Sequence, residues 1–296
     1  MSSEQLEHLK RNLREGPLDI GGPIEETRGI FEALHADLPV PESVKLSREE
    51  VGGVPALVSE APGVVPGRTV LYLHGGAHAV GSAQAGRSLS STLAAQAGAR
   101  GIALDYRLAP EHPLPANLED VIAAYRALLA DGVEPGGIAF AGDSSGGGLA
   151  LAALVAARDA GLPMPGAAVL FSPWIDLALT GASVQSKADD DPSLYRDGLL
   201  RRAADYLAGD DPCTPLANAL YADLSGLPPL LIQVGSSEIL LDDATRLAAR
   251  AGRYDLSVQL DIWPQMPHVW QVFFPILDEG RQAVDKAAAF ITTHLI

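Results

Sequence analysis

Short apolar runs alternate with longer amphipathic stretches along the chain from Gly67 onward. Such runs, bounded by glycine, proline or charged residues, predict buried strands, and the stretches between them have the period of helices that cover a sheet face. The runs are TVLYL, GIALDY, GIAFAG, AAVLF, LLIQV and VQLDIW, which begin at Thr69, Gly101, Gly137, Ala167, Leu230 and Val258. The alternation predicts an α/β fold, in which crossover helices cover both faces of a mostly parallel sheet.

Two segments do not follow this alternation: residues 1–45 and about 176–212. Both have polar, helix-like patterns, and insertions of this kind often form lids over a site. The apolar positions of a helix predicted in the second segment are Leu199, Leu200, Ala203 and Leu207. We expect the two segments to form a helical cap, and residues 46–175 and 213–296 to form the α/β domain.

The second segment also contains an acidic run, Asp189 to Asp191. Clustered carboxylates can bind a cation. A solvated loop at the start of a helix is the interpretation we favour, because negative charge is stabilised at a helix N-terminus and charge runs are usually exposed.

Composition and charge narrow the class of protein. The chain has 296 residues, of which 47% are hydrophobic, so it can bury a sizeable core. Its net charge of −16 argues against binding to nucleic acid or anionic lipid, both of which select basic surfaces. We therefore expect a small-molecule partner, and neither nucleic acid nor membrane.

The N-terminal sequence and the cysteine content bear on location. MSSEQLEHLK is polar where a secretory signal needs an apolar core, and no apolar run approaches the ~20 residues of a membrane span. Cys213 is the single cysteine, which excludes an intrachain disulfide and metal motifs built on two cysteines. These features predict a soluble, cytoplasmic protein.

The candidate nucleophile lies in GDSSGGGLALAAL, at the end of the predicted strand GIAFAG. Gly142, Ser144 and Gly146 satisfy G-x-S-x-G, in which the serine occupies a strained strand-to-helix turn. A helix predicted over 147–158 would direct its positive end at Ser144, where negative charge develops during acyl transfer. A glycine turn that only opens a packed helix is the alternative. A phosphate loop is disfavoured, because no Lys-Ser/Thr pair follows the glycines.

A serine hydroxyl needs a general base, and histidine suits that role near neutral pH. His268 follows the last predicted strand in WPQMPHVWQVF, so we expect it at the same carboxyl edge of the sheet as Ser144. Other histidines lie in the expected cap, in the proline-rich APEHPLPA or near the C-terminus: His8, His35, His112 and His294. We predict that His268 is the base, with a structural histidine as the alternative.

The histidine in turn needs a carboxylate that fixes its tautomer. LLIQVGSSEILLDDA offers Glu238, in the loop just after a strand, and Asp242 and Asp243, which resemble the first turn of a helix. The chain order Ser144, Glu238, His268 is the order found in α/β hydrolases, so we favour Glu238 over Asp242. Asp143 adjoins the serine and is assigned a supporting structural role.

The strand TVLYL ends at HGGA, a loop with almost no side chains. Such a loop can leave backbone N–H groups free for a developing oxyanion, whereas a tight turn without a ligand is the alternative. Gly76 and Ala77 are the predicted donors, with the N–H of Ser145 as the third. Gly75 either donates as well or permits the turn.

Taken together, HGGAH, DYRLAPEHPLPA, GDSSGG and the Glu238 and His268 loops resemble the bacterial carboxylesterases of the hormone-sensitive lipase group of α/β hydrolases. The resemblance runs from about Gly67 to the C-terminus. It implies an eight-stranded, mostly parallel sheet with a helical cap, no cofactor or metal, hydrolysis of short acyl esters, and a homodimer. Two positions depart from the family pattern: Ala77 replaces the third glycine of His-Gly-Gly-Gly, and Glu238 replaces the usual aspartate.

The predicted activity is that of a carboxylesterase working through an acyl-enzyme. Trp174 and Leu207 are candidates for an acyl pocket, although either can simply belong to the core. An amidase or another acyl transferase could use the same triad, because these motifs do not specify the leaving group. A receptor that binds without hydrolysis is disfavoured by the presence of His268.

Overall fold

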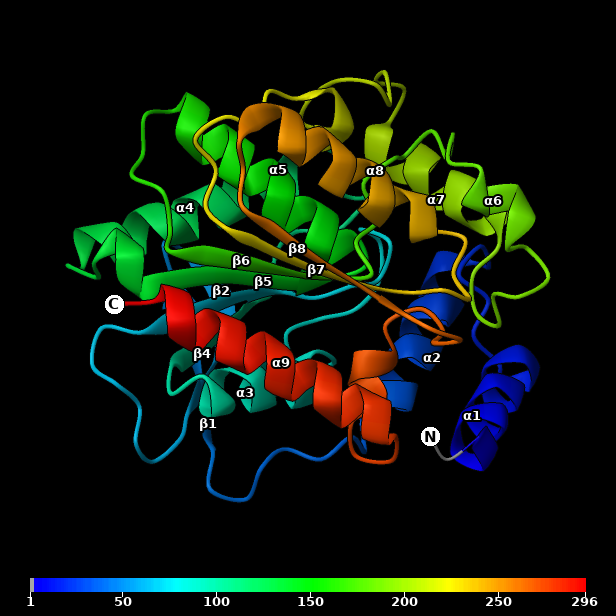
Figure 1. The fold of residues 1–296 in the computed structure, drawn as a ribbon, viewed down its shortest axis with the longest axis horizontal. Coiled ribbons are helices and arrows are strands. Elements are labelled where there is room, and N and C mark those ends of the chain that lie inside the picture. Colours follow the sequence, from blue (N-terminus) through cyan, green and yellow to red (C-terminus); the bar gives the residue numbers. More distant parts are fainter. Residues whose placement is uncertain (1–2) are drawn as a thin grey trace.

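The computed structural model describes residues 3–296 and contains one sheet of eight strands in the order β1-β2-β4-β3-β5-β6-β7-β8 (Figure 1). The strands are β1 (Lys45–Val51), β2 (Val54–Glu60), β3 (Thr69–Leu73), β4 (Arg100–Leu104), β5 (Ile138–Asp143), β6 (Ala167–Phe171), β7 (Leu230–Gly235) and β8 (Val258–Trp263). The pairs β1·β2 and β2·β4 are antiparallel and the others are parallel. The predicted eight-stranded, mostly parallel sheet is therefore confirmed.

Each of the six apolar runs forms one of the strands β3 to β8. The expectation of a buried strand was wrong for β8, whose residues are half-buried or exposed because it lies at the edge of the sheet. The pattern alone did not indicate the hairpin β1–β2. The reason is burial: β1 exposes all of its residues except Val51, because it lies at the edge of the sheet and faces solvent. An edge strand of this kind carries no apolar signal.

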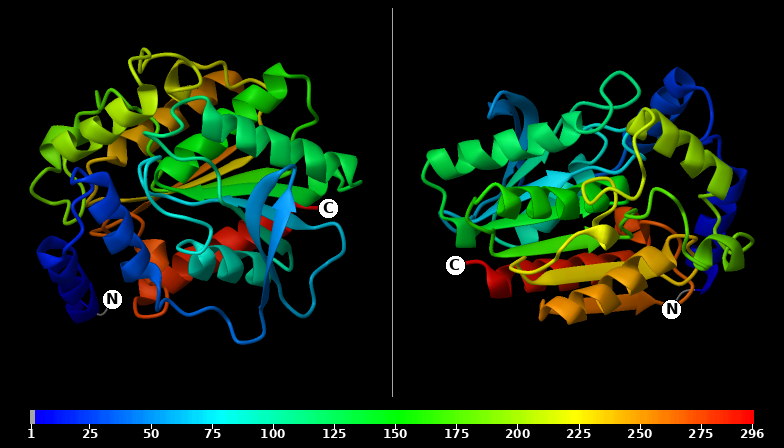
Figure 2. Two further views of the ribbon diagram at one scale, coloured as in Figure 1. Left: turned by 180° about the vertical axis from the view of Figure 1, so that it is seen from behind. Right: turned by 90° about the horizontal axis from the view of Figure 1, so that it is seen from above.

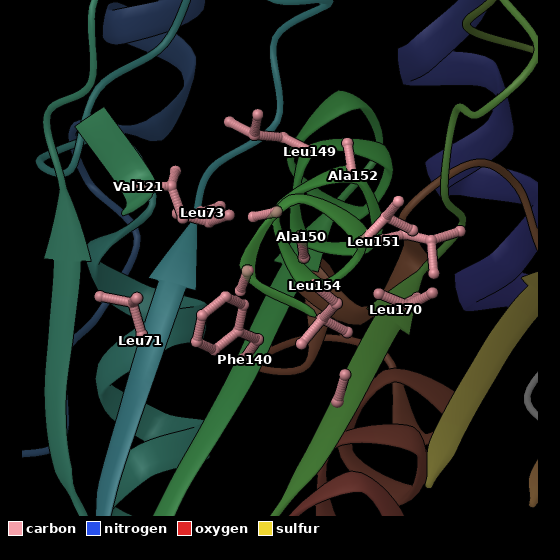
Figure 3. Packing of buried hydrophobic residues seen from close by; sticks show 14 of the residues in the cluster. Leu71, Leu73, Val121, Phe140, Leu149, Ala150, Leu151, Ala152, Leu154 and Leu170 are labelled. Carbon is pink, nitrogen blue, oxygen red and sulfur yellow. The ribbon is translucent and has the colours of Figure 1, made fainter. Parts of the chain in front are cut away.

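Helices cover both faces of the sheet, as the alternation predicted. In Figure 1, α3 (Arg87–Gln96) and α9 (Asp278–His294) lie below the sheet, and α4 (Ala116–Ala130), α5 (Ser145–Asp159) and α8 (Leu241–Ala251) lie above it. Figure 3 shows Ala150 and Leu154 of α5 against Phe140 and Leu170 of the central strands, all fully buried. This packing fixes α5, and with it the turn that precedes α5.

The remaining α-helices gather at one end of the sheet, at the right of Figure 1. They are α1 (Ser3–Glu15), α2 (Ile24–His35), α6 (Ser183–Ser186) and α7 (Arg196–Leu207). The two segments that carry them contact each other: Arg201 donates to the carbonyl of Gly21 at 2.8 Å, and the Tyr195 hydroxyl donates to Asp19 at 2.5 Å. The views in Figure 2 show the same grouping. We call them the N-terminal segment (residues 1–45) and the 176–212 segment; their assignment as a cap stays a prediction.

Short 3-10 helices complete the fold at Pro135–Gly137, Ala219–Tyr221, Gly252–Tyr254 and Trp270–Phe273. Among the described residues, none of the helices has the length and apolar character needed to span a membrane.

Candidate active site

Ser144 occupies the sharp turn between β5 and α5. Its backbone has φ 53° and ψ −124°, a combination that non-glycine residues rarely adopt and that costs about 1–3 kcal/mol. Gly142 and Gly146 make this turn possible: a Cβ on Gly146 would lie 2.1 Å from the carbonyl oxygen of Leu73, and one on Gly142 would lie 2.4 Å from the carbonyl oxygen of Gly146. The strand-turn-helix expected around G-x-S-x-G is present.

The side chains of Ser144, His268 and Glu238 form one hydrogen-bonded chain. His268 Nε2 lies 2.9 Å from Ser144 Oγ, and His268 Nδ1 lies 2.8 Å from Glu238 Oε2. The three residues follow β5, β8 and β7, whose carboxyl ends share one edge of the parallel sheet. Ser144 and His268 are 124 positions apart in sequence, and Glu238 and His268 are 30 apart. They meet because the strands that precede them lie next to one another or are separated by one or two strands in the sheet.

Glu238 is fully buried, and donors surround its carboxylate. Its Oε1 accepts the N–H of Gly235 at 2.6 Å and the hydroxyl of Ser172 at 2.7 Å, which leaves Oε2 for His268. The Ser172 oxygen in turn accepts the N–H of Val269 at 3.1 Å. Ser172 therefore joins the glutamate to the histidine loop. Sequence analysis did not single it out, although its place after the strand AAVLF was the available signal.

The two aspartates weighed as alternatives to Glu238 have other partners. Asp242 accepts the N–H of Ser183 at 2.9 Å, and Asp243 accepts the N–H groups of Ile175 and Asp176 at 2.7 and 2.8 Å. Burial raises the pKa of Asp243 to about 7. Both lie in the first turn of α8, as the sequence predicted.

Opposing effects set the pKa of His268, whose side chain is only 9% exposed. Burial alone would lower this pKa, because it disfavours the imidazolium. The hydrogen bond and the charge of Glu238 outweigh burial, and the charges of Asp191 and Asp143 act in the same direction. The net result is a pKa above the usual value of 6.5, so the imidazolium is stabilised where a proton would be received.

Asp143 anchors the loop after β3. Its Oδ1 accepts the buried hydroxyl of Tyr72 at 2.6 Å and the N–H of Gly75 at 3.0 Å. Of the two roles considered for Gly75, the structure shows its N–H engaged by this carboxylate. Gly75 therefore shapes the turn.

Three other backbone N–H groups near the nucleophile have no acceptor within residues 3–296: those of Gly76, Ala77 and Ser145. Gly76 has φ 123°, and a Cβ there would lie 2.1 Å from the carbonyl oxygen of Val80. Ala77, at the position where the family pattern has glycine, has φ 52°. These donors are the ones the sequence selected for an oxyanion hole.

His78, the last residue of HGGAH, is held from several directions. Its N–H donates to Ser145 Oγ at 3.1 Å, and its ring stacks on Tyr206 of α7 with ring centroids 3.9 Å apart. Its Nδ1 lies 3.2 Å from Asn117 Nδ2, and the Asn117 oxygen accepts the Tyr206 hydroxyl at 2.9 Å. Burial, together with nearby His74, lowers the pKa of His78 to about 3, so the ring is neutral. Sequence analysis assigned no role to His78, because its partners are distant in sequence.

A small cavity adjoins this stack. It is lined by His78, Gly148, Leu149, Ala152, Trp174, Ile175, Tyr206, Leu216, Ala217 and Ala219. Trp174 is thus a wall residue. Leu207 is 6% exposed and belongs to the same apolar cluster as Trp174, but it is not among the lining residues.

The loop that carries the glutamate, Ser236 to Leu240, contacts both outer segments; we call it the acid loop. Lys10 of the N-terminal segment donates to Ser237 Oγ at 3.3 Å. The Ser183 hydroxyl donates to the carbonyl of Ile239 at 2.6 Å, and Asp191 accepts the N–H of Ile239 at 2.9 Å. The acid loop is therefore held from two sides. The α/β core binds Ser236, the Ser237 backbone and the Glu238 carboxylate, and the outer segments bind Ser237 Oγ and the Ile239 backbone.

The interpretation of Asp189–Asp191 as a solvated loop at a helix start was wrong for one residue. Asp189 and Asp190 are exposed, but Asp191 is only 8% exposed, and α7 begins later, at Arg196. The local sequence could not show that Asp191 turns inward to bind backbone N–H groups. No group of three or more His, Cys, Asp or Glu side chains within residues 3–296 is arranged to hold a metal ion.

An elbow serine at the carboxyl edge of a mostly parallel sheet is the arrangement that defines the α/β hydrolases. Residues 70–272 match the family model for the alpha/beta hydrolase fold. The solved structure of an esterase from the bacterial hormone-sensitive lipase family superposes with a TM-score of 0.96 and 45% sequence identity, covering 100% of both chains. The chain belongs to the hormone-sensitive lipase family, as its motifs implied.

Two similar bacterial proteins support this assignment. An acetyl-hydrolase of Streptomyces hygroscopicus is 53% identical over 227 residues, which cover 77% of this chain and 76% of that protein. A putative acetyl-hydrolase, LipR, of Mycobacterium tuberculosis is 34% identical over 268 residues, which cover 90% and 87%. The protein is thus a carboxylic ester hydrolase.

Proposed function

We propose that the protein is a carboxylesterase that hydrolyses short-chain acyl esters, with Ser144, His268 and Glu238 as its catalytic triad. The observation that carries the proposal is the continuous chain of hydrogen bonds, 2.9 and 2.8 Å long, from the serine hydroxyl through the imidazole to the buried carboxylate. This geometry lets the imidazole remove the hydroxyl proton while the carboxylate stabilises the resulting imidazolium.

In the proposed mechanism, Ser144 Oγ attacks the ester carbonyl as His268 Nε2 takes its proton. The tetrahedral intermediate collapses to an acyl-enzyme when His268 returns that proton to the leaving alcohol. Water then attacks the acyl-enzyme as His268 takes a proton from it. His268 returns this proton to Ser144 Oγ, which releases the carboxylic acid and regenerates the free serine. No cofactor or metal enters this scheme.

The N–H groups of Gly76, Ala77 and Ser145 would stabilise the oxyanion of both tetrahedral intermediates. Removing one such donor typically costs about 3 kcal/mol of transition-state stabilisation. The positive end of α5 adds to the same field, because the helix begins at Ser145.

The preference for short acyl groups is supported by the walls of the cavity. Trp174, Tyr206 and His78 are buried rings, and the stack and hydrogen bonds around His78 limit their movement. Leu207 would act from behind this wall, within the cluster that contains Trp174. The similar Streptomyces protein is named an acetyl-hydrolase, which also favours a small acyl group. In this proposal the N-terminal and 176–212 segments form the cap over the pocket.

The first experiment measures hydrolysis of p-nitrophenyl acetate, butyrate and octanoate by the purified protein before and after a serine-directed sulfonyl fluoride. We expect faster turnover of the two shorter esters, loss of activity with the reagent, and a mass adduct on Ser144. Ser144→Ala should give neither hydrolysis nor adduct. An adduct elsewhere, or activity that survives in Ser144→Ala, would contradict the proposed nucleophile, and a faster octanoate reaction would contradict the acyl preference.

Matched ester and amide substrates test the rival amidase, since the same triad can cleave both. The homodimer and the cytoplasmic location stay predictions, and the first is checked by light scattering of the purified protein.

A further inference from the structure

The carboxylate of Asp191 is saturated by backbone N–H groups. Its Oδ1 accepts from Ser193 and Leu194 at 3.0 and 2.9 Å, and its Oδ2 accepts from Ile239 at 2.9 Å. The Ser193 hydroxyl adds a bond at 3.2 Å. A carboxylate at 8% exposure that is satisfied by N–H donors fixes the direction of each donor, because a buried donor without an acceptor is costly.

The peptide group that Asp191 holds is the one attached to the catalytic acid. The N–H of Ile239 belongs to the peptide that begins at the carbonyl of Glu238. The next carbonyl, that of Ile239, accepts the Ser183 hydroxyl at 2.6 Å. Both peptide groups that follow Glu238 are therefore held by the 176–212 segment.

Fixing these two peptide groups helps to position the Glu238 carboxylate. A glutamate has one more rotatable bond than the aspartate of the family pattern, so the position of its carboxylate is less restricted by its own backbone. An error of about 1 Å in a catalytic group can cost as much as 100-fold in rate. Fixing the backbone on one side of Glu238, while Gly235 and Ser172 bind its carboxylate on the other, restores the lost restriction.

We propose that Asp191 is a positioning residue, through which the 176–212 segment orients Glu238 toward His268. This inference rests on the proposed role of Glu238. Asp191 acts through the glutamate and touches no reacting atom.

Electrostatics gives the role a separate signature. The charged groups that raise the pKa of His268 are Glu238, Asp191 and Asp143, from the acid loop, the 176–212 segment and the elbow. Lys10 lies nearby on Ser237 of the acid loop. Removing the charge of Asp191 should therefore shift the ascending limb of the pH–rate profile to lower pH. This shift reports the charge, whereas kcat and the exchange of the Ile239 amide report the positioning of Glu238.

The test compares Asp191→Asn with Asp189→Asn, which removes the same charge two residues earlier from an exposed side chain. An asparagine has one acceptor oxygen, so its NH2 group must oppose either Ile239 or the turn at Ser193. With p-nitrophenyl acetate we expect kcat to fall roughly tenfold in Asp191→Asn with KM within about twofold, and the limb to move to lower pH. Hydrogen exchange at the Ile239 amide should speed up. Asp189→Asn should match the wild type in all four measurements.

A kcat in Asp191→Asn equal to that of Asp189→Asn would overturn the inference, even with a shifted pH limb, as would a change confined to KM. If Asp191→Asn does not fold, the test uses Ser183→Ala, which removes the hydrogen bond to the Ile239 carbonyl. We expect kcat of this variant to fall about two- to fivefold while KM is retained. An unchanged kcat overturns the inference. The proposed function fails separately, through an inactive wild type or an adduct away from Ser144. The exchange rate of Ile239 still reports on the Asp191 contact in that case.

Discussion

The loops on the two sides of Ser144 are held in different ways. The oxyanion-side loop after β3 is hydrogen-bonded to the α/β core at its turn, through Asp143 and through Ser145 of α5. It contacts the outer segments further along, where His78 stacks on Tyr206 and Ala79 accepts from Arg28. The acid loop after β7 is bonded to the core at Ser236, Ser237 and the Glu238 carboxylate, but the two peptide groups that follow Glu238 are bound by Asp191 and Ser183 of the 176–212 segment.

The difference follows from what each loop supplies. Oxyanion donors are backbone N–H groups, which must be fixed before charge develops, so attachment to the rigid core suits them. The glutamate acts through a side chain at the end of three rotatable bonds, and outer segments can adjust it. The comparison therefore predicts two kinds of defect: loss of the charge and position of Glu238 on the acid side, and loss of backbone donors on the oxyanion side. The following variants separate them.

The largest effect is expected on the acid side. Glu238→Gln keeps the shape of the side chain but removes the charge that stabilises the imidazolium, so kcat should fall about 10³- to 10⁴-fold. The remaining activity should show its ascending limb at lower pH, because the charge and hydrogen bond that raise the pKa of His268 are lost. Steady-state kinetics across pH 5 to 9 checks both results; activity within tenfold of the wild type would contradict the assignment of the acid.

On the oxyanion side, Gly76→Ala should lower kcat about 10²- to 10³-fold. The added Cβ would lie 2.1 Å from the carbonyl oxygen of Val80, and φ 123° is unfavourable for alanine, so the turn must move. Gly53→Ala is the matched control, since Gly53 has φ 81° with open space around it. The control should lose stability, as its melting temperature will show, but keep kcat. Equal kcat losses in both variants would mean that strain alone explains the effect.

The wild-type pH profile should be governed by His268. The base must be neutral to accept the serine proton, and its pKa is raised, so kcat/KM should decline as pH falls through a value above 6.5. Each further unit of pH below that value should reduce kcat/KM about tenfold. A limb centred below 6.5 would contradict the balance described for this histidine.

The smallest expected effects come from removing one hydroxyl on each side. Ser172→Ala removes a bond to Glu238 and the acceptor for Val269, so we expect kcat to fall roughly tenfold. Tyr72→Phe removes one donor to Asp143 while Gly75 remains bound, so a fall of about two- to fivefold is expected. Both are measured with p-nitrophenyl acetate. A larger fall in kcat for Tyr72→Phe than for Ser172→Ala would contradict the expected order of the two sides.

How far the sequence predicted the structure depended on burial. The fully buried strands Thr69–Leu73 and Ala167–Phe171 have the bounds of their apolar runs. Val258–Trp263 also has the predicted bounds, although its residues are half-buried or exposed. The strand Lys45–Val51 is polar and was not predicted. The three residues of the candidate triad were selected from their places after strands, a rule that topology makes general for parallel sheets.

The supporting residues could not be selected in this way. Asp191 has the local composition of a solvated run, yet it is buried and bonds to Ile239, 48 residues away. His78 and Tyr206 are far apart in sequence, and neither lies in a pattern that indicates the other. Contacts of this kind depend on how the outer segments pack on the sheet. Neither a hydrophobic period nor a motif in a single sequence predicts that packing.

The hydrogen bond between Ile239 and Asp191 also bears on the exchange of parts between relatives. Grafting the 176–212 segment of another esterase onto this chain would be a natural way to transfer its choice of acyl group. In this protein the graft would replace part of the support of Glu238, the proposed catalytic acid, together with Tyr206 of the cavity wall. Chimeras that keep Asp191 and Ser183 should transfer selectivity without losing turnover, so the two properties are inherited as one unit unless these side chains are retained.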